Sequence, residues 1–175
     1  MIETVVESIR VSLVTQHRVV ILKEVEGERH LPIWIGVFEA EAIAMVLQGV
    51  SAARPLPYDL LTSVIAELGA EIQRIVVTDL NQDVFYARVV LVHNGMELTI
   101  DSRPSDAIAL AVRAKVPILV DEGVMERAGI RLGDEEGDED GRGDESAEYD
   151  DDRLSAFRDF ISTLDLDDFG NKPSS

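Results

Sequence analysis

Short runs of alternating hydrophobic and polar residues, typical of β-strands, fill the first part of the chain. Three such runs cover residues 3–14, 18–25 and 29–35, and Glu26-Gly27 separates the second from the third. Runs of this length that are joined by short turns predict an antiparallel meander of three strands.

After Gly36 the spacing of hydrophobic residues changes from a period of two to a helical one. A helix is predicted over residues 38–47, because its apolar residues fall at i, i+4, i+7 and i+8: Phe38, Ala42, Met45 and Val46. A loop over residues 51–57 leads to a second predicted helix, with Asp59 as its expected N-cap and Gly69 as its C′ residue. The apolar residues of this helix are Leu61, Val64, Ile65 and Leu68.

The strongest local signal is Asn94-Gly95, which lies between apolar runs over residues 84–93 and 96–102. This dipeptide favours a type I′ turn, because both central residues of that turn need a positive φ. A two-residue loop fixes the register of the hairpin and places Arg88 opposite Asp101 on one face. The other face carries an apolar row made of Val89, Leu91, Leu98 and Ile100.

The remaining segments complete a mixed fold. We expect a strand over residues 71–78, a turn over 79–83, a helix over 104–115, a buried strand over 118–120 and a short helix over 124–128. Pro104 suits the first turn of its helix, where the missing N–H costs nothing. Together these elements predict an α+β domain with a single mixed, largely antiparallel sheet covered by helices.

The net charge of −18 divides the chain into three expected parts. Residues 1–133, the predicted folded domain, contain 18 acidic and 12 basic residues. Residues 134–152 contain 12 acidic residues, one basic residue and almost no apolar side chain, which predicts a disordered acidic linker. In residues 153–175 an amphipathic helix is predicted from the spacing of Leu154, Phe157, Ile161 and Leu164. Linker and helix together would fit a basic protein as partner.

Composition and motifs exclude several classes of protein. The chain has no cysteine, so disulfides and thiolate metal sites are excluded. The N-terminus lacks the features of a signal peptide and no apolar run approaches the ~20 residues of a membrane span, so a cytoplasmic protein without membrane contact is expected. P-loop, dinucleotide-binding and serine-hydrolase motifs do not occur. The mild acidity of residues 1–133 argues against strong metal-free binding of nucleic acid.

Candidate chemistry concentrates at the corner between the hairpin and the helix that follows it. Asp101 and Asp106 flank this bend, and two carboxylates there would hold a hard divalent cation. Arg103 lies between them and would clamp a phosphate through its forked guanidinium. Simpler roles are favoured for three of these residues: Ser105 and Asp106 as groups that stabilise a helix N-terminus, and Asp101 as the cross-strand partner of Arg88. For Arg103, an ion pair to either aspartate is an equal alternative.

Other polar and aromatic residues are weaker candidates. Glu39 and Glu41 cannot serve one metal together, since residues two apart on a helix are rotated by about 200°. The histidines, His17, His30 and His93, lack the spacing of metal ligands, and His30 is expected on an edge strand. Trp34 follows the apolar pattern of its strand and is expected to be a core or interface anchor.

Two stretches together resemble the bifunctional nuclease family. They are Asp-Ser-Arg-Pro-Ser-Asp-Ala-Ile-Ala-Leu-Ala over residues 101–111, and Leu-Pro-Ile-Trp-Ile-Gly over residues 31–36 with Glu39-Ala40 after it. The resemblance covers about residues 9–130. It implies hydrolysis of phosphodiester bonds in DNA and RNA. The catalytic candidates for this activity are the residues of the corner described above: Asp101, Arg103, Ser105 and Asp106. The ligands for Mg²⁺ or Mn²⁺ would then be Asp101, Asp106 and Glu39.

An alternative function remains open beside the nuclease. In it the chain is a non-catalytic regulatory or protein-interaction module, and the motif residues brace the fold. The acidic balance of the chain favours this alternative. A homo-oligomer is a further expectation, because a helix-covered sheet with an exposed Trp-bearing segment favours association.

Overall fold

A computed structural model describes residues 1–11 and 17–131, which form four helices and one eight-stranded sheet. The strands are β1 (Ile2–Val11), β2 (Arg18–Glu24), β3 (Arg29–Ile35), β4 (Ala70–Asn81), β5 (Val84–His93), β6 (Met96–Ser102), β7 (Ile118–Val120) and β8 (Ile130–Arg131). The helices are α1 (Val37–Leu47), α2 (Pro57–Glu67), α3 (Pro104–Ala114) and α4 (Glu122–Ala128). The predicted α+β class with one sheet is therefore confirmed. The predicted acidic linker and C-terminal helix lie outside the described residues.

The sheet is mixed because one pair of neighbouring strands runs in parallel. Its strand order is β6-β5-β4-β7-β1-β2-β3-β8, and every pair is antiparallel except β4 with β7. The short strand β7 thus joins the N-terminal meander of β1, β2 and β3 to the antiparallel β4-β5-β6 half. This meander was predicted from the sequence, and its two pairings are confirmed.

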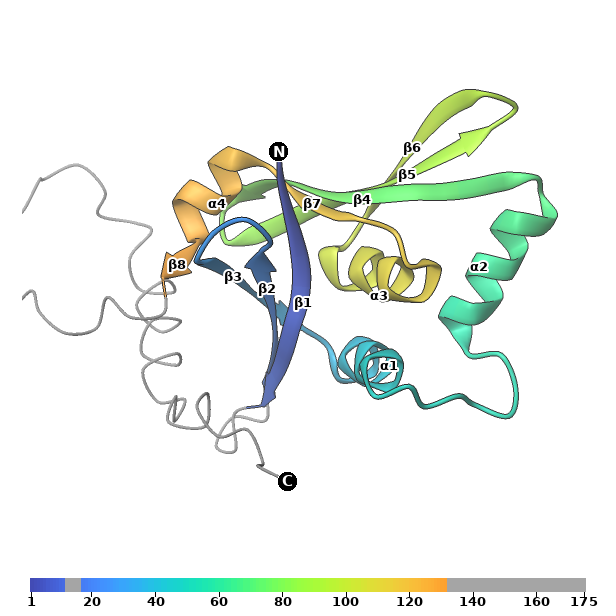
Figure 1. Cartoon of the computed structure of the whole chain (residues 1–175), viewed down its shortest axis with the longest axis horizontal. Helices are drawn as coiled ribbons and strands as arrows, with labels where there is room; N and C mark the ends of the chain where they lie inside the picture. The colour runs from blue at the N-terminus through green and yellow to red at the C-terminus, as the bar shows by residue number, and fades with distance from the viewer. Residues whose placement is uncertain (12–16, 132–175) are drawn as a thin grey trace, which may run out of the picture. The chain divides into compact units, whose positions relative to one another are not determined.

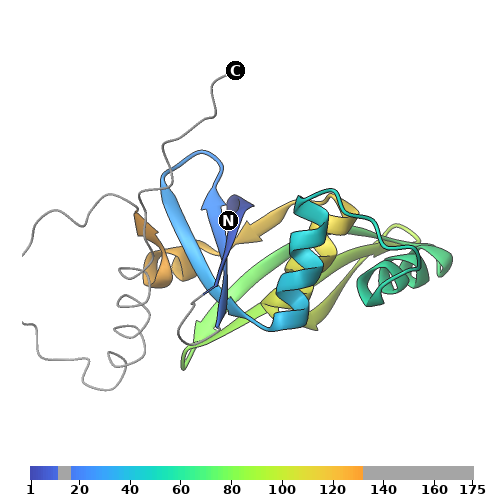
Figure 2. The same cartoon turned by 90° about the horizontal axis from the view of Figure 1, so that it is seen from below.

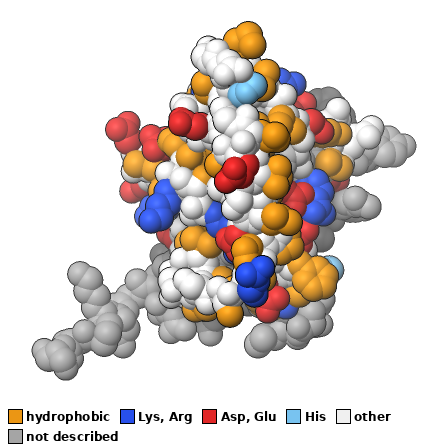
Figure 3. All heavy atoms as spheres, turned by 90° about the vertical axis from the view of Figure 1, so that its right-hand side faces the viewer, with side chains coloured by type: hydrophobic (Ala, Val, Ile, Leu, Met, Phe, Trp, Pro, Cys, Tyr) orange, Lys and Arg blue, Asp and Glu red, His pale blue; other side chains and the backbone are white. Residues whose placement is uncertain are grey.

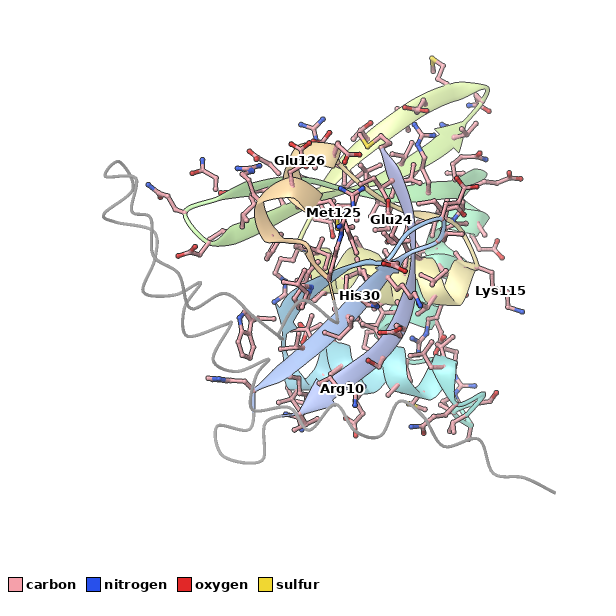
Figure 4. All side chains as sticks on the ribbon, turned by 60° about the vertical axis from the view of Figure 1, so that its left-hand side comes forward. Arg10, Glu24, His30, Lys115, Met125 and Glu126 are labelled. Atoms are coloured by element: carbon pink, nitrogen blue, oxygen red, sulfur yellow. The ribbon has the colours of Figure 1, made fainter. Side chains whose placement is uncertain are left out.

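Helices α1, α2 and α3 lie on one face of the sheet (Figures 1 and 2). The central helix, α3, buries seven of its eleven residues: Pro104, Ser105, Ala107, Ile108, Ala109, Leu110 and Ala111. Its alanines allow a close approach to the apolar strand residues Ile75 and Val77, which are fully buried. Lys115 ends α3 in a left-handed conformation, with φ 56°, and its side chain points away from the domain (Figure 4).

Two tight turns set the register of the β4-β5-β6 half. Asn94 and Gly95 have φ values of 51° and 75°, as the predicted type I′ turn requires, and Arg88 lies directly opposite Asp101. The turn predicted over residues 79–83 is wrong in length. Strand β4 continues to Asn81, and the turn consists of Gln82 and Asp83, with φ values of 48° and 60°.

Two helix predictions need correction. Asp59 is not the N-cap of α2, because Pro57 begins the helix one turn earlier; the Asp59 carboxylate instead accepts a hydrogen bond from the backbone N–H of Leu56 at 2.8 Å. Phe38 does not belong to the buried stripe of α1. That stripe consists of Ala40, Ala42 and Ile43, whereas the Phe38 residue is 81% exposed.

His30 is also placed differently from the prediction. Strand β3 pairs with β2 on one side and with β8 on the other, so His30 is not on an edge strand. The residue is buried, and its Nε2 lies 3.4 Å from Oε1 of Glu7 (Figure 4 labels His30). Trp34 is 42% exposed, so it is not a core residue. None of the described helices is long and apolar enough to span a membrane.

Candidate functional site

The site is built where β6 ends and α3 begins, next to the start of α1. Arg103 has extended backbone angles and is the N-cap residue of α3, with Pro104 at the first helical position. Gly36 takes the same place before α1, and Glu39 lies in the first turn of that helix. A Cβ at Gly36 would collide with the Glu39 carboxylate, so a glycine at this position makes space for that carboxylate.

The Arg103 guanidinium connects the two helix N-termini. Its Nε donates to Oδ2 of Asp106 at 2.7 Å, and its Nη2 donates to Oε1 of Glu39 at 2.6 Å and to Oδ1 of Asp106 at 3.1 Å. The Arg103 side chain is nevertheless 68% exposed. Its Nη1 makes no hydrogen bond to any residue that the structure describes. The guanidinium is therefore held by two carboxylates while one of its edges remains open to a ligand.

Asp106 accepts a further hydrogen bond, from the hydroxyl of Tyr58 on α2 at 2.7 Å. Burial alone would raise the pKa of Asp106, but the hydrogen bonds from Arg103 and Tyr58 outweigh it and hold this pKa below its usual value. Burial and the Asp106 carboxylate raise the pKa of the Tyr58 phenol. At neutral pH Asp106 is therefore ionised and accepts hydrogen bonds, while the Tyr58 phenol stays protonated and donates one.

A second arginine, Arg113, also joins α1, α2 and α3. The Nε of Arg113, on α3, donates to Oδ1 of Asp59 on α2 at 2.6 Å, and its Nη1 donates to the carbonyl of Ala42 on α1 at 2.9 Å. The Arg113 side chain is only 8% exposed, and its guanidinium carbon lies 5.8 Å from the centre of the Tyr58 ring. This network determines where Tyr58 and Glu39 stand relative to Asp106.

The structure brings together three of the predicted site residues, Glu39, Arg103 and Asp106, and leaves two outside. Asp101 lies opposite Arg88 in the β5-β6 ladder. Along β5, Arg88 alternates with the buried residues Ala87, Val89 and Leu91. Side chains alternate between the faces of a strand, so Asp101 is on the face away from α3. Ser105 is buried in the first turn of α3, at 7% exposure.

The expected metal ligands do not form a set in this geometry. Among residues 1–11 and 17–131, no group of three or more histidine, aspartate and glutamate side chains is placed to hold a metal ion. Glu39 and Asp106 both bind Arg103, so the guanidinium takes the position between the two carboxylates that a shared cation would need. The residues present therefore fit an arginine-centred site better than the three-carboxylate metal site expected from the sequence.

One side chain of the site, that of Tyr58, was missed by the sequence reasoning. Tyr58 lies 48 residues before Asp106, and no local pattern indicates that the two would meet. Phe38, which was assigned to the buried stripe of its helix, directly precedes Glu39 in the sequence and is exposed.

Comparison with known proteins identifies the family. The model of the bifunctional nuclease domain matches residues 20–133, and the chain belongs to that family. An uncharacterized protein of Mycobacterium tuberculosis (strain ATCC 25618 / H37Rv) is 38% identical over 167 residues, which cover 95% of this chain and 97% of that protein. Bifunctional nuclease 1 of Arabidopsis thaliana is 31% identical over 120 residues, which are 66% of this chain and 37% of the plant protein. Bifunctional nuclease 2 of Oryza sativa subsp. japonica is 32% identical over 119 residues, with shares of 66% and 37%. The matched part thus spans little more than a third of these plant relatives.

Proposed function

We propose that this chain is a nuclease that hydrolyses phosphodiester bonds of DNA and RNA, and that Arg103 binds the phosphate that is cleaved. Membership of the bifunctional nuclease domain family and the names of the plant relatives support the activity. The geometry of Arg103 supports the location. An exposed guanidinium that two carboxylates hold in one orientation is the observation that carries the proposal.

The proposed role of Arg103 is electrostatic stabilisation of the reacting phosphate. Negative charge on the phosphoryl oxygens must be stabilised during hydrolysis, and a guanidinium that is already oriented does so without reorganisation. Its hydrogen bonds to Asp106 and Glu39 raise the pKa of Arg103, so the positive charge is permanent. Asp106 has a lowered pKa and is a weak base, so its main role in the proposal is to position Arg103.

An exposed aromatic residue directly before Glu39 in the sequence supports a nucleic-acid ligand. Phe38 precedes Glu39 on α1, and Glu39 binds the guanidinium of Arg103. In the proposal the exposed Phe38 ring is a stacking surface for a base of the strand whose phosphate lies on Arg103. Stacking uses the π-face that every base has and requires no 2′-hydroxyl, which fits activity on both DNA and RNA.

No step of the proposal runs through a metal ion. Mg²⁺ is commonly bound by one or two carboxylates together with substrate phosphates, and here both available carboxylates are committed to Arg103. The expectation of Mg²⁺ or Mn²⁺ therefore stays separate from the assignment of Arg103. It is tested by cleavage in the presence of each metal and in the presence of EDTA.

A non-catalytic module is the second candidate, and one observation favours it. The bonds of Arg103, Asp106 and Tyr58 join α1, α2 and α3, so the motif residues suffice as a structural brace. In that case the chain binds no nucleic acid at low salt, with or without Mn²⁺, in fluorescence anisotropy with single-stranded oligonucleotides. Binding that depends on Arg103 excludes this candidate.

The test of the proposal is cleavage of single-stranded DNA and RNA by purified wild type, Arg103→Gln and Arg127→Gln, all carried through the same preparation. Arg127 is a matched control on α4: it is 52% exposed and its Nη2 donates to Asp79 at 2.8 Å. We expect Arg103→Gln to lose at least about tenfold in rate, a typical scale for an electrostatic contact to the transition state, while Arg127→Gln keeps the wild-type rate. Equal cleavage by all three proteins would overturn the assignment and indicate a contaminating nuclease or another site.

A further inference from the structure

Glu39 and Asp106 enclose a single positive charge, and that charge belongs to the protein itself. Nη2 of Arg103 lies 2.6 Å from Oε1 of Glu39 and 3.1 Å from Oδ1 of Asp106, so one nitrogen atom contacts both carboxylates. Mg²⁺ and Ca²⁺ bind oxygen ligands at about 2.0–2.6 Å. A divalent cation at the position of Nη2 would therefore reach both oxygens after a small movement of the two side chains.

Other arginines of the domain bind carboxylates in a different way. Arg29 also contacts two of them, but through different nitrogens: its Nε and Nη2 donate to Glu24, and its Nη1 donates to Glu122. Arg127 contacts one carboxylate and two backbone carbonyls. Among these three arginines, only Arg103 places one nitrogen atom between two carboxylates, as a shared metal ion would lie.

The other oxygen positions of the pair offer little to a cation. Asp106 also accepts from Nε of Arg103 and from the hydroxyl of Tyr58, each at 2.7 Å, so three of its about four lone-pair sites are in use. The Glu39 side chain is only 12% exposed, and its Oε2 lies where a Cβ of Gly36 would be. A divalent cation could bind both carboxylates only by displacing Arg103.

The Arg103 guanidinium cannot give way by losing its charge. Its hydrogen bonds to Asp106 and Glu39 raise the pKa of Arg103, and a guanidinium is in any case charged throughout the physiological pH range. A metal ion that approached the two carboxylates would meet this like charge within a few ångströms, where the repulsion is strong. The pair is therefore closed to a second cation.

We propose that Arg103 is a resident cation that takes the place of a divalent metal ion between Glu39 and Asp106. In the wild-type protein the two carboxylates bind no Mg²⁺ or Mn²⁺, and the phosphate site operates without these ions. Removal of the guanidinium converts the same two carboxylates into a divalent-cation site, since carboxylate oxygens suit Mg²⁺ and Mn²⁺. The exclusion of metal does not depend on nuclease activity, whereas the metal-free binding of phosphate rests on the proposed function.

The exclusion of metal is tested by NMR, because bound Mn²⁺ broadens the amide signals of the residues around it. Full-length wild type, Arg103→Met and Arg127→Met are titrated with Mn²⁺, and the signals of residues 36–40 and 103–107 are followed. Methionine keeps an unbranched stem and supplies no oxygen ligand. We expect Arg103→Met to bind Mn²⁺ at these residues at least about tenfold more tightly than wild type does. Arg127→Met leaves one carboxylate, that of Asp79, and should gain no site there.

Carboxylates elsewhere in the chain determine the background of this experiment. On the face at the right of Figure 1, acidic side chains lie among hydrophobic and basic ones (Figure 3). Residues 134–152 contain a further 12 acidic residues. Broadening at such positions should be equal in all three proteins. A double variant, Arg103→Met with Asp106→Asn, keeps one carboxylate of the pair and should lose the site that Arg103→Met gains.

Two results would overturn the exclusion of metal. One is a wild type that binds Mn²⁺ at residues 36–40 and 103–107 as tightly as Arg103→Met does. The other is a folded Arg103→Met protein whose signals there broaden no more than those of wild type. If Arg103→Met does not fold, the wild-type titration decides: broadening at these residues contradicts the proposal, and sharp signals there beside a broadened acidic segment support it.

Fluorescence anisotropy with a labelled single strand tests the metal-free binding of phosphate. At constant ionic strength, the affinity of wild type in EDTA should equal that in Mn²⁺ to within about threefold. A larger loss of affinity in EDTA overturns the metal-free site. A wild type that binds no strand in either condition contradicts the proposed function, and the NMR titration then still decides whether Arg103 excludes metal from Glu39 and Asp106.

Discussion

The hydroxyl of Tyr58 donates to Oδ1 of Asp106 over 2.7 Å, and this bond joins α2 to α3 across 48 residues of the chain. Asp106 accepts from Arg103 at the same time, so the phenol and the guanidinium share one carboxylate. A carboxylate has about four lone-pair sites, and the three hydrogen bonds fill most of them. These three bonds fix the position of the Asp106 carboxylate and, through it, the orientation of the Arg103 guanidinium.

Removal of the Tyr58 hydroxyl should destabilise the domain. Tyr58→Phe takes one donor from a partly buried carboxylate, and a hydrogen bond to a charged group contributes about 1.5–3 kcal/mol. We expect the free energy of unfolding in urea to fall by about that amount. Tyr86→Phe is the matched control, because Tyr86 is 44% exposed on β5, and it should change stability by less than about 0.5 kcal/mol. Equal stability of the two variants would show that the Tyr58 bond is not formed in solution.

The stability that Asp106 contributes should depend on pH in a defined direction. Its pKa in the folded protein lies below the usual value, so the folded state favours the ionised carboxylate. The contribution is then complete above the ordinary pKa of about 3.9 and is lost as pH falls through the lower pKa of the folded state. The measurement is urea denaturation of wild type and Asp106→Asn from neutral to acid pH.

We expect the difference in unfolding free energy between these two proteins to be constant near neutrality and to shrink in acid. Asp83→Asn is the control that removes an exposed carboxylate from the β4-β5 turn and leaves the bonds of Asp106 in place. A difference for Asp106→Asn that grows on acidification would contradict the direction of the pKa shift.

Phe38 should affect binding and leave stability nearly unchanged. Because Phe38 is 81% exposed, Phe38→Ala removes little buried surface, whereas stacking of one base is worth about 1–3 kcal/mol. Under the proposed function, anisotropy with single-stranded DNA should show at least about fivefold weaker binding, which corresponds to 1 kcal/mol. Leu68→Ala, at a site of similar exposure, should bind as wild type does. Unchanged affinity of Phe38→Ala would remove the base-stacking role and leave Arg103 to be tested alone.

The sequence predicted local features of this fold well and long-range ones poorly. The register of the β5-β6 hairpin follows from Asn94-Gly95, because a two-residue type I′ turn permits one pairing only. The start of α3 at Pro104 follows from a local preference in the same way. The insertion of β7 between β4 and β1 depends instead on how segments far apart in the chain pack, and no local preference encodes it.

The same division holds for the site. Arg103 and Asp106 lie three residues apart around a helix start, and their contact is a local one that the sequence predicts. The contact of Arg103 with Glu39 spans 64 residues and depends on the packing of α1 beside α3. Asp101 was grouped with Asp106 because the two are close in sequence. The hairpin register, however, already places Asp101 on the opposite face of the sheet.

The central claim is that Arg103 contacts a backbone phosphate, and the salt dependence of binding tests it most directly. For a single strand, each neutralised phosphate contributes about −0.7 to the slope of the logarithm of the association constant against the logarithm of salt concentration. Anisotropy titrations of a labelled single strand over a range of salt concentrations compare wild type, Arg103→Gln and Arg127→Gln. We predict that the slope becomes shallower by about 0.7 for Arg103→Gln and is unchanged for Arg127→Gln. The same slope for all three proteins would contradict the account.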